Sequence, residues 1–260
     1  MLRWVIATEL GSDSTIGVFI DAVKRSGAEI IPVNMEEMLT PSYQPPIFDS
    51  KPTIFYGPVN FISRMERLGF YPGVFGTSET YSYGNMVDHI PHSMIFNNPS
   101  ETFTGTSESI IEKIAETEED YFFKPYLDNK SISGSVKSTA DIKKFCELVM
   151  KGLIPDTAVD DKFVLAKPYG IESEYRLFVV DGEIITGSMY QPRYSPNIPS
   201  KVISFGKEII KLWNPQPIFV LDIAVSMDNC FVMEVQNFHS AGFYDSFVDK
   251  LVGVINDKYQ

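Results

Sequence analysis

Short apolar runs separated by amphipathic stretches dominate the first 70 residues. The runs RWVIATE, EIIPVN and TIFYG, at residues 3–9, 29–34 and 53–57, are typical of buried strands. Between and after them, the pattern predicts helices over GSDSTIGVFIDAVKRSG and FISRMERLG. We expect the first helix to begin near Ser12 or Ser14 and to end at Gly27. This alternation of strand and helix predicts a small parallel sheet.

Residues 70–106 show no clear hydrophobic period and are rich in Gly, Pro, Tyr and Ser. The composition predicts irregular structure and a domain boundary near 98–106. We therefore expect a small α/β domain over residues 1–98 and a second region over residues 99–260.

The second region mixes strands and helices in a different order. Asp181-Gly182 is the strongest turn signal in the chain and predicts a hairpin over 174–191. The other predicted strands are 121–126 and 163–169, and the predicted helices are an acidic one within 107–120, then 140–152, 200–214 and one within 244–258.

A second hairpin is expected in LDIAVSMDNCFVMEVQN, residues 221–237. A three-residue loop at 227–229, with Asn229 left-handed, would set Asp222 opposite Glu234. This register gathers an apolar face made of Leu221, Ile223, Val225, Phe231, Met233 and Val235. The opposite face would carry Asp222, Ala224, Ser226, Cys230, Val232, Glu234 and Gln236.

Like charges directly opposite each other destabilise a sheet, so Asp222 and Glu234 need a compensating charge or solvent. Mg²⁺ prefers oxygen ligands and takes only one or two protein carboxylates, and the Gln236 amide could add a third oxygen. The alternative is a solvated sheet face on which both acids lie in water.

Two cationic side chains lie in strand patterns. With the Asp181-Gly182 turn, Arg176 would lie opposite Gly187 and share its face with Glu174, which leaves space for an anion beside the guanidinium. The alternative is an exposed Arg–Glu pair on a sheet edge. Lys124, in YFFKPY, either holds a phosphate or extends to solvent.

The loop after Lys124 carries Lys130, Ser131, Ser133, Gly134 and Ser135. Small and hydroxylated residues let backbone N–H groups approach phosphate oxygens. The chain contains no P-loop and no GxGxxG pattern. The loop is therefore a candidate phosphate contact without a standard nucleotide motif.

The remaining candidates are histidines and cysteines. His89 and His92 flank Pro91 in the irregular region and are expected at the surface, whereas His239 follows the acidic hairpin and stays open as a supporting or substrate contact. The two cysteines, Cys146 and Cys230, lack metal-ligand spacing and are expected to be buried, reduced thiols.

Composition narrows the class of protein. With 260 residues, 44% of them hydrophobic and 22% charged, the chain is globular. A net charge of −12 argues against a general nucleic-acid partner. The first apolar run is too short for a signal peptide, and no stretch approaches a membrane span. We expect a cytoplasmic protein with no membrane partner; a homodimer is left open.

The order of these motifs is more informative than each motif alone. A strand lysine and a small-residue loop come first, then FVLAKPY leading into E-x-E-x-R-L-F-V-V-D-G, then facing acids followed by EVQNFHSAGFY. Over residues 95–245 this order resembles the ATP-grasp superfamily, and closest to it are ATP-grasp-domain proteins with FxKP, ExRxFVVDG and EVN-type blocks. The resemblance implies an ATP-grasp fold of class α/β (α+β), preceded by a small pre-ATP-grasp α/β domain.

The resemblance also implies a role for each candidate residue. Arg176 would stabilise the transferring phosphoryl group, and Asp222, Glu234 and Gln236 would hold Mg²⁺. The residues implied to bind ATP are Lys124, Lys130, Ser133 and Gly134 at the phosphates, Ala166, Lys167, Pro168 and Tyr169 at the adenine, and Glu172 and Glu174 at the ribose or beside Arg176. The implied substrate contacts are Arg193, His239, Ser240 and Tyr244.

The implied reaction is an ATP-dependent ligation of a carboxylate to an amine or a thiol through an acyl phosphate. Its partners would be a small-molecule or peptide carboxylate and an amine acceptor. Two departures from the family pattern, Gln236 in place of the usual Asn and no entrance lysine around HIPHSMIFNNPS, keep two alternatives open. One is a nucleotide-binding module without ligase turnover, and the other is a structural α/β protein.

Overall fold

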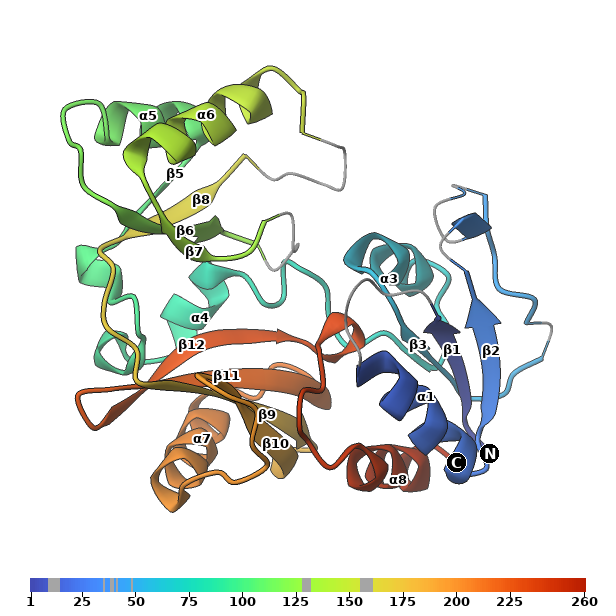
Figure 1. Ribbon diagram of the computed structural model, residues 1–260. Coiled ribbons are helices and arrows are strands. Elements are labelled where there is room, and N and C mark those ends of the chain that lie inside the picture. Colours follow the sequence, from blue (N-terminus) through green and yellow to red (C-terminus); the bar gives the residue numbers. More distant parts are fainter. Residues whose placement is uncertain are drawn as a thin grey trace.

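The computed structural model describes residues 1–8, 15–34, 36–37, 40, 42–47, 49–127, 132–154 and 161–260. Three four-stranded sheets organise this part of the chain (Figure 1). We call them the N-terminal, middle and C-terminal sheets, in the order in which their first strands occur. Figure 1 shows the middle sheet above the C-terminal sheet, with the N-terminal sheet beside them.

The N-terminal sheet has the order β2-β1-β3-β4 and is parallel, as its strand–helix alternation predicts. Every residue of β1 and β3 is buried, which explains their unbroken apolar runs. The strands are β1 (Arg3–Ala7), β2 (Glu29–Val33), β3 (Thr53–Tyr56) and β4 (Pro72–Gly73), and the helices are α1 (Thr15–Arg25) and α3 (Val59–Glu66). Ser12 and Ser14 lie outside the described residues.

The middle sheet is antiparallel with the order β5-β8-β6-β7, and two helices cover its far face (Figure 1). Phe123, Phe163 and Cys146 belong to the apolar core between sheet and helices. The elements are β5 (Phe103–Gly105), α5 (Ser107–Lys113), β6 (Tyr121–Pro125), β7 (Ser135–Lys137), α6 (Thr139–Met150) and β8 (Phe163–Ala166). The predicted strands and the helix over 140–152 are confirmed within a few residues.

The C-terminal sheet has the order β10-β9-β11-β12, all antiparallel, and α7 covers the face that points away from the middle sheet (Figure 1). Leu177 and Ile223 point toward α7, where Gly206 leaves room for their side chains. The elements are β9 (Ser173–Val180), β10 (Glu183–Gln191), α7 (Ser200–Leu212), β11 (Ile218–Ser226) and β12 (Asn229–Asn237).

The C-terminal helix α8 (Val248–Lys258) packs against α1 of the N-terminal unit. The buried indole Nε1 of Trp4 donates a hydrogen bond of 2.9 Å to Asn256 Oδ1. The same core contains Phe178 from β9 and Phe238 from the 3-10 helix η3 (Phe238–Ser240). The N-terminal sheet therefore shares a hydrophobic core with the C-terminal sheet.

The expectation of irregular structure over residues 70–106 is wrong in part. The segment contains α4 (Tyr83–His89), two 3-10 helices, η1 (His92–Met94) and η2 (Pro99–Glu101), and the strand β5. Ser82 caps α4 by accepting a hydrogen bond from the backbone N–H of Asn85. A seven-residue helix is too short to give a clear hydrophobic period, so the Ser cap was the readable signal.

The turn of the acidic hairpin also differs from expectation. It consists of two residues, Met227 and Asp228, with φ of 46° and 62°, and Ser226 pairs with Asn229. Asp222 nevertheless faces Glu234, as predicted, because a bulge between Asp222 and Ile223 offsets the shorter turn. Two differences from the expected loop therefore cancel at the acidic pair.

The same bulge rearranges the predicted faces of β12. Met233 has no partner in the register and lines a cavity together with Glu234, so it does not belong to the apolar face. Val232 replaces it there, opposite Ile223 and fully buried. An extra residue inserted into one strand reverses the side of every residue beyond it.

A second bulge changes the register of the β9–β10 hairpin. Arg176 pairs with Ser188, and Gly187 pairs with Leu177, so the expected pairing of Arg176 with Gly187 is wrong by one residue. The irregularity between Ile184 and Thr186 is the cause. Local turn chemistry fixes the turn at Asp181-Gly182, but packing of the strands fixes where the bulge occurs.

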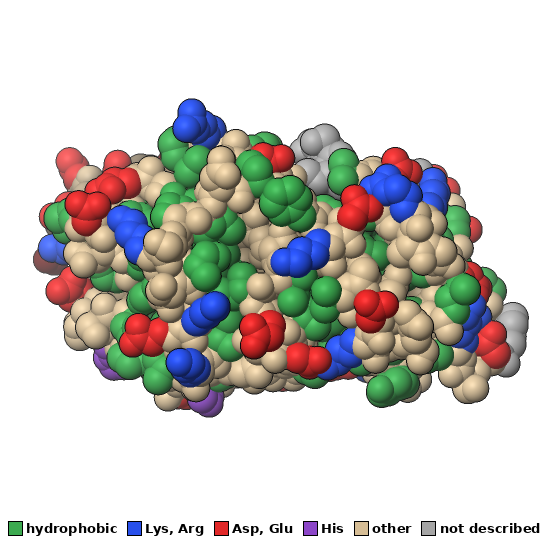
Figure 2. Space-filling model, turned by 90° about the horizontal axis from the view of Figure 1, so that it is seen from below, with side chains coloured by type: hydrophobic (Ala, Val, Ile, Leu, Met, Phe, Trp, Pro, Cys, Tyr) green, Lys and Arg blue, Asp and Glu red, His purple; other side chains and the backbone are tan. Residues whose placement is uncertain are grey.

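The surface on the side of α7 and α8 carries mixed charges. Figure 2 shows this lower face, where Lys and Arg side chains lie among Asp and Glu side chains with apolar groups between them. Charges of both signs placed side by side are typical of a solvated surface. On this face the excess of acidic residues is therefore not gathered into one patch.

The cysteines are free, with Cys146 buried and Cys230 partly exposed. His89 and His92 are exposed, as expected. Across the described part of the chain, no helix has the length and apolar character needed to cross a membrane.

Candidate functional site

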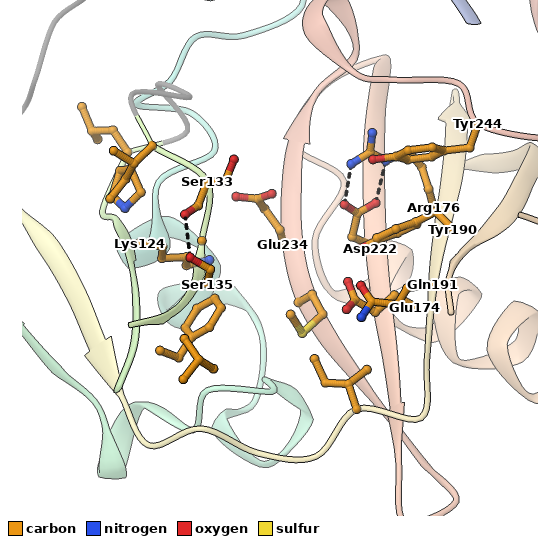
Figure 3. A pocket seen from close by; sticks show the side chains of 18 residues that line it. Lys124, Ser133, Ser135, Glu174, Arg176, Tyr190, Gln191, Asp222, Glu234 and Tyr244 are labelled. Carbon is orange, nitrogen blue, oxygen red and sulfur yellow. Dashed lines mark hydrogen bonds and ion pairs between the residues drawn. The ribbon is translucent and has the colours of Figure 1, made fainter. Parts of the chain in front are cut away.

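A cavity of about 550 Å³ lies between the middle and C-terminal sheets. Figure 3 shows the side chains that project into it from both sides. The lining residues are Phe122, Lys124, Pro125, Leu127, Ile132, Ser133, Gly134, Ser135, Val136, Ile171, Glu174, Arg176, Tyr190, Gln191, Asp222, Met233, Glu234 and Tyr244. Residues that are far apart in the sequence, from β6 to the segment after η3, thus form a single site.

Arg176 and Asp222 form a buried, two-point ion pair on one wall of the cavity (Figure 3). Nε of Arg176 donates to Asp222 Oδ1 at 2.9 Å, and Nη2 donates to Oδ2 at 2.7 Å. The side chain of Gln236 donates from Nε2 to the same Oδ2 at 2.6 Å, and Arg176 Nη1 donates to the carbonyl of Gly242 at 3.0 Å. Both charged partners are therefore held by several charge-assisted hydrogen bonds.

Burial and pairing act on the pKa of Arg176 in opposite directions. Burial lowers the pKa of the guanidinium, but the charge and hydrogen bonds of Asp222 outweigh it and leave the pKa well above its ordinary value. Arg176 and Asp222 are 7% and 3% exposed. The expectations of an exposed Arg–Glu pair and of a solvated Asp222 are therefore both wrong.

Tyrosines surround the guanidinium. Its Cζ lies 4.8 Å from the ring centroid of Tyr244 and 5.6 Å from that of Tyr190. The two rings stack at 4.9 Å with planes 16° apart, and Tyr194 contacts Tyr244 at 5.4 Å. Tyr244 has φ of 50°, in the left-handed region that a non-glycine residue rarely adopts. The tertiary contacts of Tyr244 hold this strained backbone in place.

Glu174 lies on β9 two residues before Arg176 and lines the same cavity. Burial raises the pKa of its carboxyl group, and the charge of Asp222 raises it further. A hydrogen bond with the Tyr190 side chain and the charge of Arg176 oppose this rise without cancelling it. Glu174 is therefore an acid whose partner in the site is a hydroxyl group.

The opposite wall carries the predicted phosphate contacts. Lys124 is buried to 8% exposure, with Nζ 5.7 Å from the ring centroid of Tyr83, so its extension to solvent is wrong. Ser133 and Gly134 line the cavity beside it. A Cβ on Gly134 would come within 3.0 Å of Phe122 Cζ and 3.2 Å of Lys124 Cβ, so glycine lets this loop lie close against β6. Lys130 lies outside the described residues.

The carboxylates of Asp222 and Glu234 are the candidate Mg²⁺ ligands. Within the described residues, no group of three or more His, Cys, Asp or Glu side chains could hold a metal ion. Mg²⁺ in nucleotide sites commonly uses only one or two carboxylates, the rest of its ligands being phosphates and water. Asp222 accepts three hydrogen bonds, which leaves part of its capacity of about four lone-pair sites. The donor set therefore fits Mg²⁺ bound together with a nucleotide.

Several predicted nucleotide contacts are not on the cavity wall. Ala166 is buried in β8 opposite Phe122, while Lys167 and Pro168 are exposed. Tyr169 donates a hydrogen bond from its hydroxyl to Glu101. The side chain of Glu172 accepts from the backbone N–H of Met227 at 2.7 Å, at the tip of the acidic hairpin.

Of the predicted substrate contacts, only Tyr244 lines the cavity. His239 is fully buried at a joint between the sheets, where Nδ1 donates to the Phe55 carbonyl at 2.5 Å and Nε2 accepts from the Phe75 N–H at 2.7 Å. Ser240 donates to Asn237 Oδ1 at 2.9 Å, and Arg193 is exposed. His239 therefore has both ring nitrogens occupied by backbone groups.

Sequence reasoning missed Tyr190 and Gln191, which line the cavity beside Glu174. The Asp181-Gly182 turn offered a signal, because a hairpin closed there must bring the end of β10 beside the start of β9. Gln191 pairs with Glu174 in the register, but a second irregularity between Met189 and Gln191 shifts this part of the strand. The simple hairpin rule could not reveal that shift.

Comparison with known proteins places this cavity in a family. A family model for an ATP-grasp domain, the third family of its clade, matches residues 84–255, about two thirds of the chain. The chain belongs to this ATP-grasp family. The resemblance read from the motif order is confirmed, and so is the ATP-grasp fold with mixed α/β sheets. No curated protein matches the sequence.

Solved structures share the fold of this ATP-grasp protein at low sequence identity. A RimK domain ATP-grasp protein from Sphaerobacter thermophilus is 14% identical with a TM-score of 0.62, covering 100% of this chain and 99% of that one. The D-cycloserine synthetase DcsG is 12% identical with a TM-score of 0.61, covering 100% of each chain. The D-alanine–D-alanine ligase from Bacillus anthracis is 13% identical with a TM-score of 0.56, covering 100% and 96%.

Proposed function

We propose that this ATP-grasp protein is an ATP-dependent ligase that joins a carboxylate to an amine or a thiol through an acyl phosphate. One observation carries the proposal: Lys124 from the middle sheet and Arg176, Asp222 and Glu234 from the C-terminal sheet line the same cavity. Cationic and acidic groups on opposite walls match a metal–nucleotide bound between the two sheets. The similar folds of DcsG and D-alanine–D-alanine ligase support this reaction class.

The middle-sheet wall would hold the nucleotide phosphates. Lys124 supplies a point charge, and the loop around Ser133 and Gly134 supplies hydroxyl and backbone N–H donors. The backbone of residues 166–169 and the carboxyl groups of Glu172 and Glu174 remain expectations for the adenine and ribose. A structure of the D-alanine–D-alanine ligase complexed with ATP shares this fold at 13% identity and a TM-score of 0.56.

The C-terminal sheet would provide the electrostatics of phosphoryl transfer. Bound Mg²⁺, held by Asp222, Glu234 and Gln236, would neutralise charge on the phosphates. Arg176 donates to Asp222 and to the Gly242 carbonyl, so its fork is already oriented at the cavity wall. In the reaction, Arg176 would turn part of this fork toward the moving phosphoryl group, where catalysis consists of positioning and charge stabilisation.

The acceptor and donor are proposed by class. The cavity opens beside Tyr244, and a small-molecule or peptide carboxylate would bind there with the amine acceptor. The ATP-grasp ligase PsnB, solved in complex with a precursor peptide and AMPPNP, shares the fold at 12% identity and a TM-score of 0.51. This likeness supports including peptides among the candidate substrates.

The first experiment is thermal unfolding with and without Mg-ATP, followed by an assay of ADP release with a panel of amino acids and short peptides. A ligand at 100 times its Kd stabilises a protein by about 2.7 kcal/mol, which gives a readable shift. We expect a shift in the parent that disappears in the Asp222→Asn/Glu234→Gln variant, each measured against its own baseline. No shift in the parent at millimolar Mg-ATP would refute the proposal.

A second candidate is a nucleotide-binding module without turnover. The observation that favours it is the double engagement of Asp222, by the Arg176 fork and by the amide N–H group of Gln236. If this network does not open, Arg176 cannot reach a phosphoryl group. This candidate predicts the same thermal shift with Mg-ATP but no ADP release with any acceptor.

A further inference from the structure

Glu174 is the cavity carboxylate that the proposed phosphoryl transfer does not use. Three carboxylate side chains line the described part of the cavity: Asp222 pairs with Arg176, and Glu234 lies opposite Asp222 in the register. Glu174 forms no ion pair within 4.0 Å among the described residues, and its side chain hydrogen-bonds Tyr190. A half-buried carboxylate with only a hydroxyl partner can still accept hydrogen bonds from a ligand.

The surroundings of Glu174 favour a cation. The described lining holds two cationic side chains, Lys124 and Arg176, and three carboxylates, Glu174, Asp222 and Glu234. With the Arg176–Asp222 pair neutral in sum, one lysine faces two carboxylates. Lys124 projects from the opposite wall, away from Glu174 (Figure 3). The charge around Glu174 is therefore negative, which favours an ammonium group over a second carboxylate.

Neighbouring groups complete an ammonium site on the same wall. Gln191 pairs with Glu174 in the register and lines the cavity, so its amide oxygen is a second acceptor near the carboxylate. Figure 3 shows Glu174 and Gln191 side by side, below Tyr190. The Tyr190 and Tyr244 rings form an adjacent aromatic surface of the kind that attracts cations. An ammonium group carries three donors and matches two oxygen acceptors beside aromatic rings.

We propose that Glu174, Gln191 and Tyr190 form the acceptor subsite and that it selects a protonated primary amine rather than a thiol. The inference rests on the proposed ligase function and narrows its acceptor class. Glu174 binds the ammonium group directly, Gln191 shares its hydrogen bonds, and Tyr190 orients the carboxylate through its hydroxyl. The amine nitrogen is thereby brought to the cavity that holds Arg176 and the metal ligands.

The test uses n-butylammonium as a probe on the full-length protein saturated with Mg-ATP. We expect added thermal stabilisation by n-butylammonium at pH 7.5 and none by 1-butanol, its neutral counterpart. Glu174→Gln removes one charge-assisted hydrogen bond and should raise the probe's Kd by about tenfold or more. Glu183→Gln makes the same change at an exposed position of the same hairpin and should leave the Kd unchanged.

The pH dependence of probe binding separates a binding role from a structural one. Binding requires ionised Glu174, which faces Arg176 on its own strand, Tyr190 and Gln191 on β10, Asp222 on β11, and Lys124 and Glu234 across the cavity. The Tyr190 hydrogen bond favours the ionised form, so Tyr190→Phe should move the midpoint of binding to higher pH. An unmoved midpoint would contradict the assigned role of Tyr190.

The outcomes distinguish the two proposals. If Mg-ATP gives no shift, the proposed function fails, whatever the amine does. If Mg-ATP binds but n-butylammonium and 1-butanol have equal effects, or Glu174→Gln binds the probe as the parent does, the amine subsite is wrong. In that case the ligase function is unaffected, and a thiol or neutral acceptor takes its place.

Discussion

The guanidinium of Arg176 and the carboxylate of Asp222 are register partners on adjacent strands and meet through two parallel hydrogen bonds of 2.9 and 2.7 Å. The pair is almost fully buried, and stacked tyrosines cover the guanidinium. Because phosphoryl transfer requires Arg176 to face a nucleotide, this ion pair connects the stability of the C-terminal sheet to its proposed chemistry.

Asp222→Asn should destabilise the protein. The substitution leaves Arg176 buried without its counter-charge, which typically costs about 3–5 kcal/mol. Equilibrium urea unfolding measures the change in the free energy of unfolding. The matched control is Asp228→Asn, because the ion pair of Asp228 with Lys201 is exposed and should contribute less than about 1 kcal/mol. Equal effects of the two substitutions would contradict the buried-pair argument.

Arg176→Lys should impair turnover far more than nucleotide binding. Lysine keeps the charge but lacks the planar fork that pairs with Asp222 and would contact the phosphoryl group. Loss of one such preorganised donor lowers kcat by about 100- to 1,000-fold in other enzymes. ADP release gives kcat, and the Mg-ATP thermal shift reports binding. A variant with full kcat would remove Arg176 from phosphoryl transfer.

Gly134→Ala should weaken Mg-ATP binding while leaving the fold intact. The added Cβ would lie 3.0 Å from Phe122 Cζ and 3.2 Å from Lys124 Cβ, so the loop must move away from β6. Such overpacking costs about 1–3 kcal/mol, which corresponds to roughly a tenfold increase in Kd if the loop binds phosphate. Isothermal titration measures the Kd. Gly253→Ala, which places its Cβ in open space, is the control.

His239 should make stability depend on pH between about 4 and 6.5. Burial lowers its pKa from 6.5 to about 4, although the hydrogen bond to the Phe55 carbonyl acts in the opposite direction. As the pH falls below 6.5 the unfolded chain binds a proton that the native histidine does not accept until about pH 4, so stability is lost across this interval. The predicted loss is about 3 kcal/mol.

Urea unfolding at several pH values measures this loss. In His239→Gln the contribution of residue 239 should vanish, so that the curve of stability against pH becomes flatter between 4 and 6.5. His89→Gln changes an exposed histidine and should leave the curve as in the parent. Parallel curves for the parent and His239→Gln would show that the buried ring is not the source.

Patterns of short range carried most of the fold from the sequence alone. The apolar runs of β1 and β3 and the Asp181-Gly182 turn each act within a few residues, so their elements could be predicted directly. The motif order identified the ATP-grasp family, and the facing of Asp222 and Glu234 was also predicted correctly. These features depend on local backbone preference and on the alternation of side chains along a strand.

Only the tertiary structure decided how the site is assembled. Bulges in β10 and β12 set which residues face the cavity, and they placed Met233 and Ser188 where a regular hairpin would not. The partner of Arg176 lies 46 residues away, and His239 is enclosed by backbone groups of a different sheet. Such contacts arise from the packing of whole sheets, whose energy depends on distant surfaces fitting together. The sequence therefore determined the elements and the family, and packing determined which charges meet.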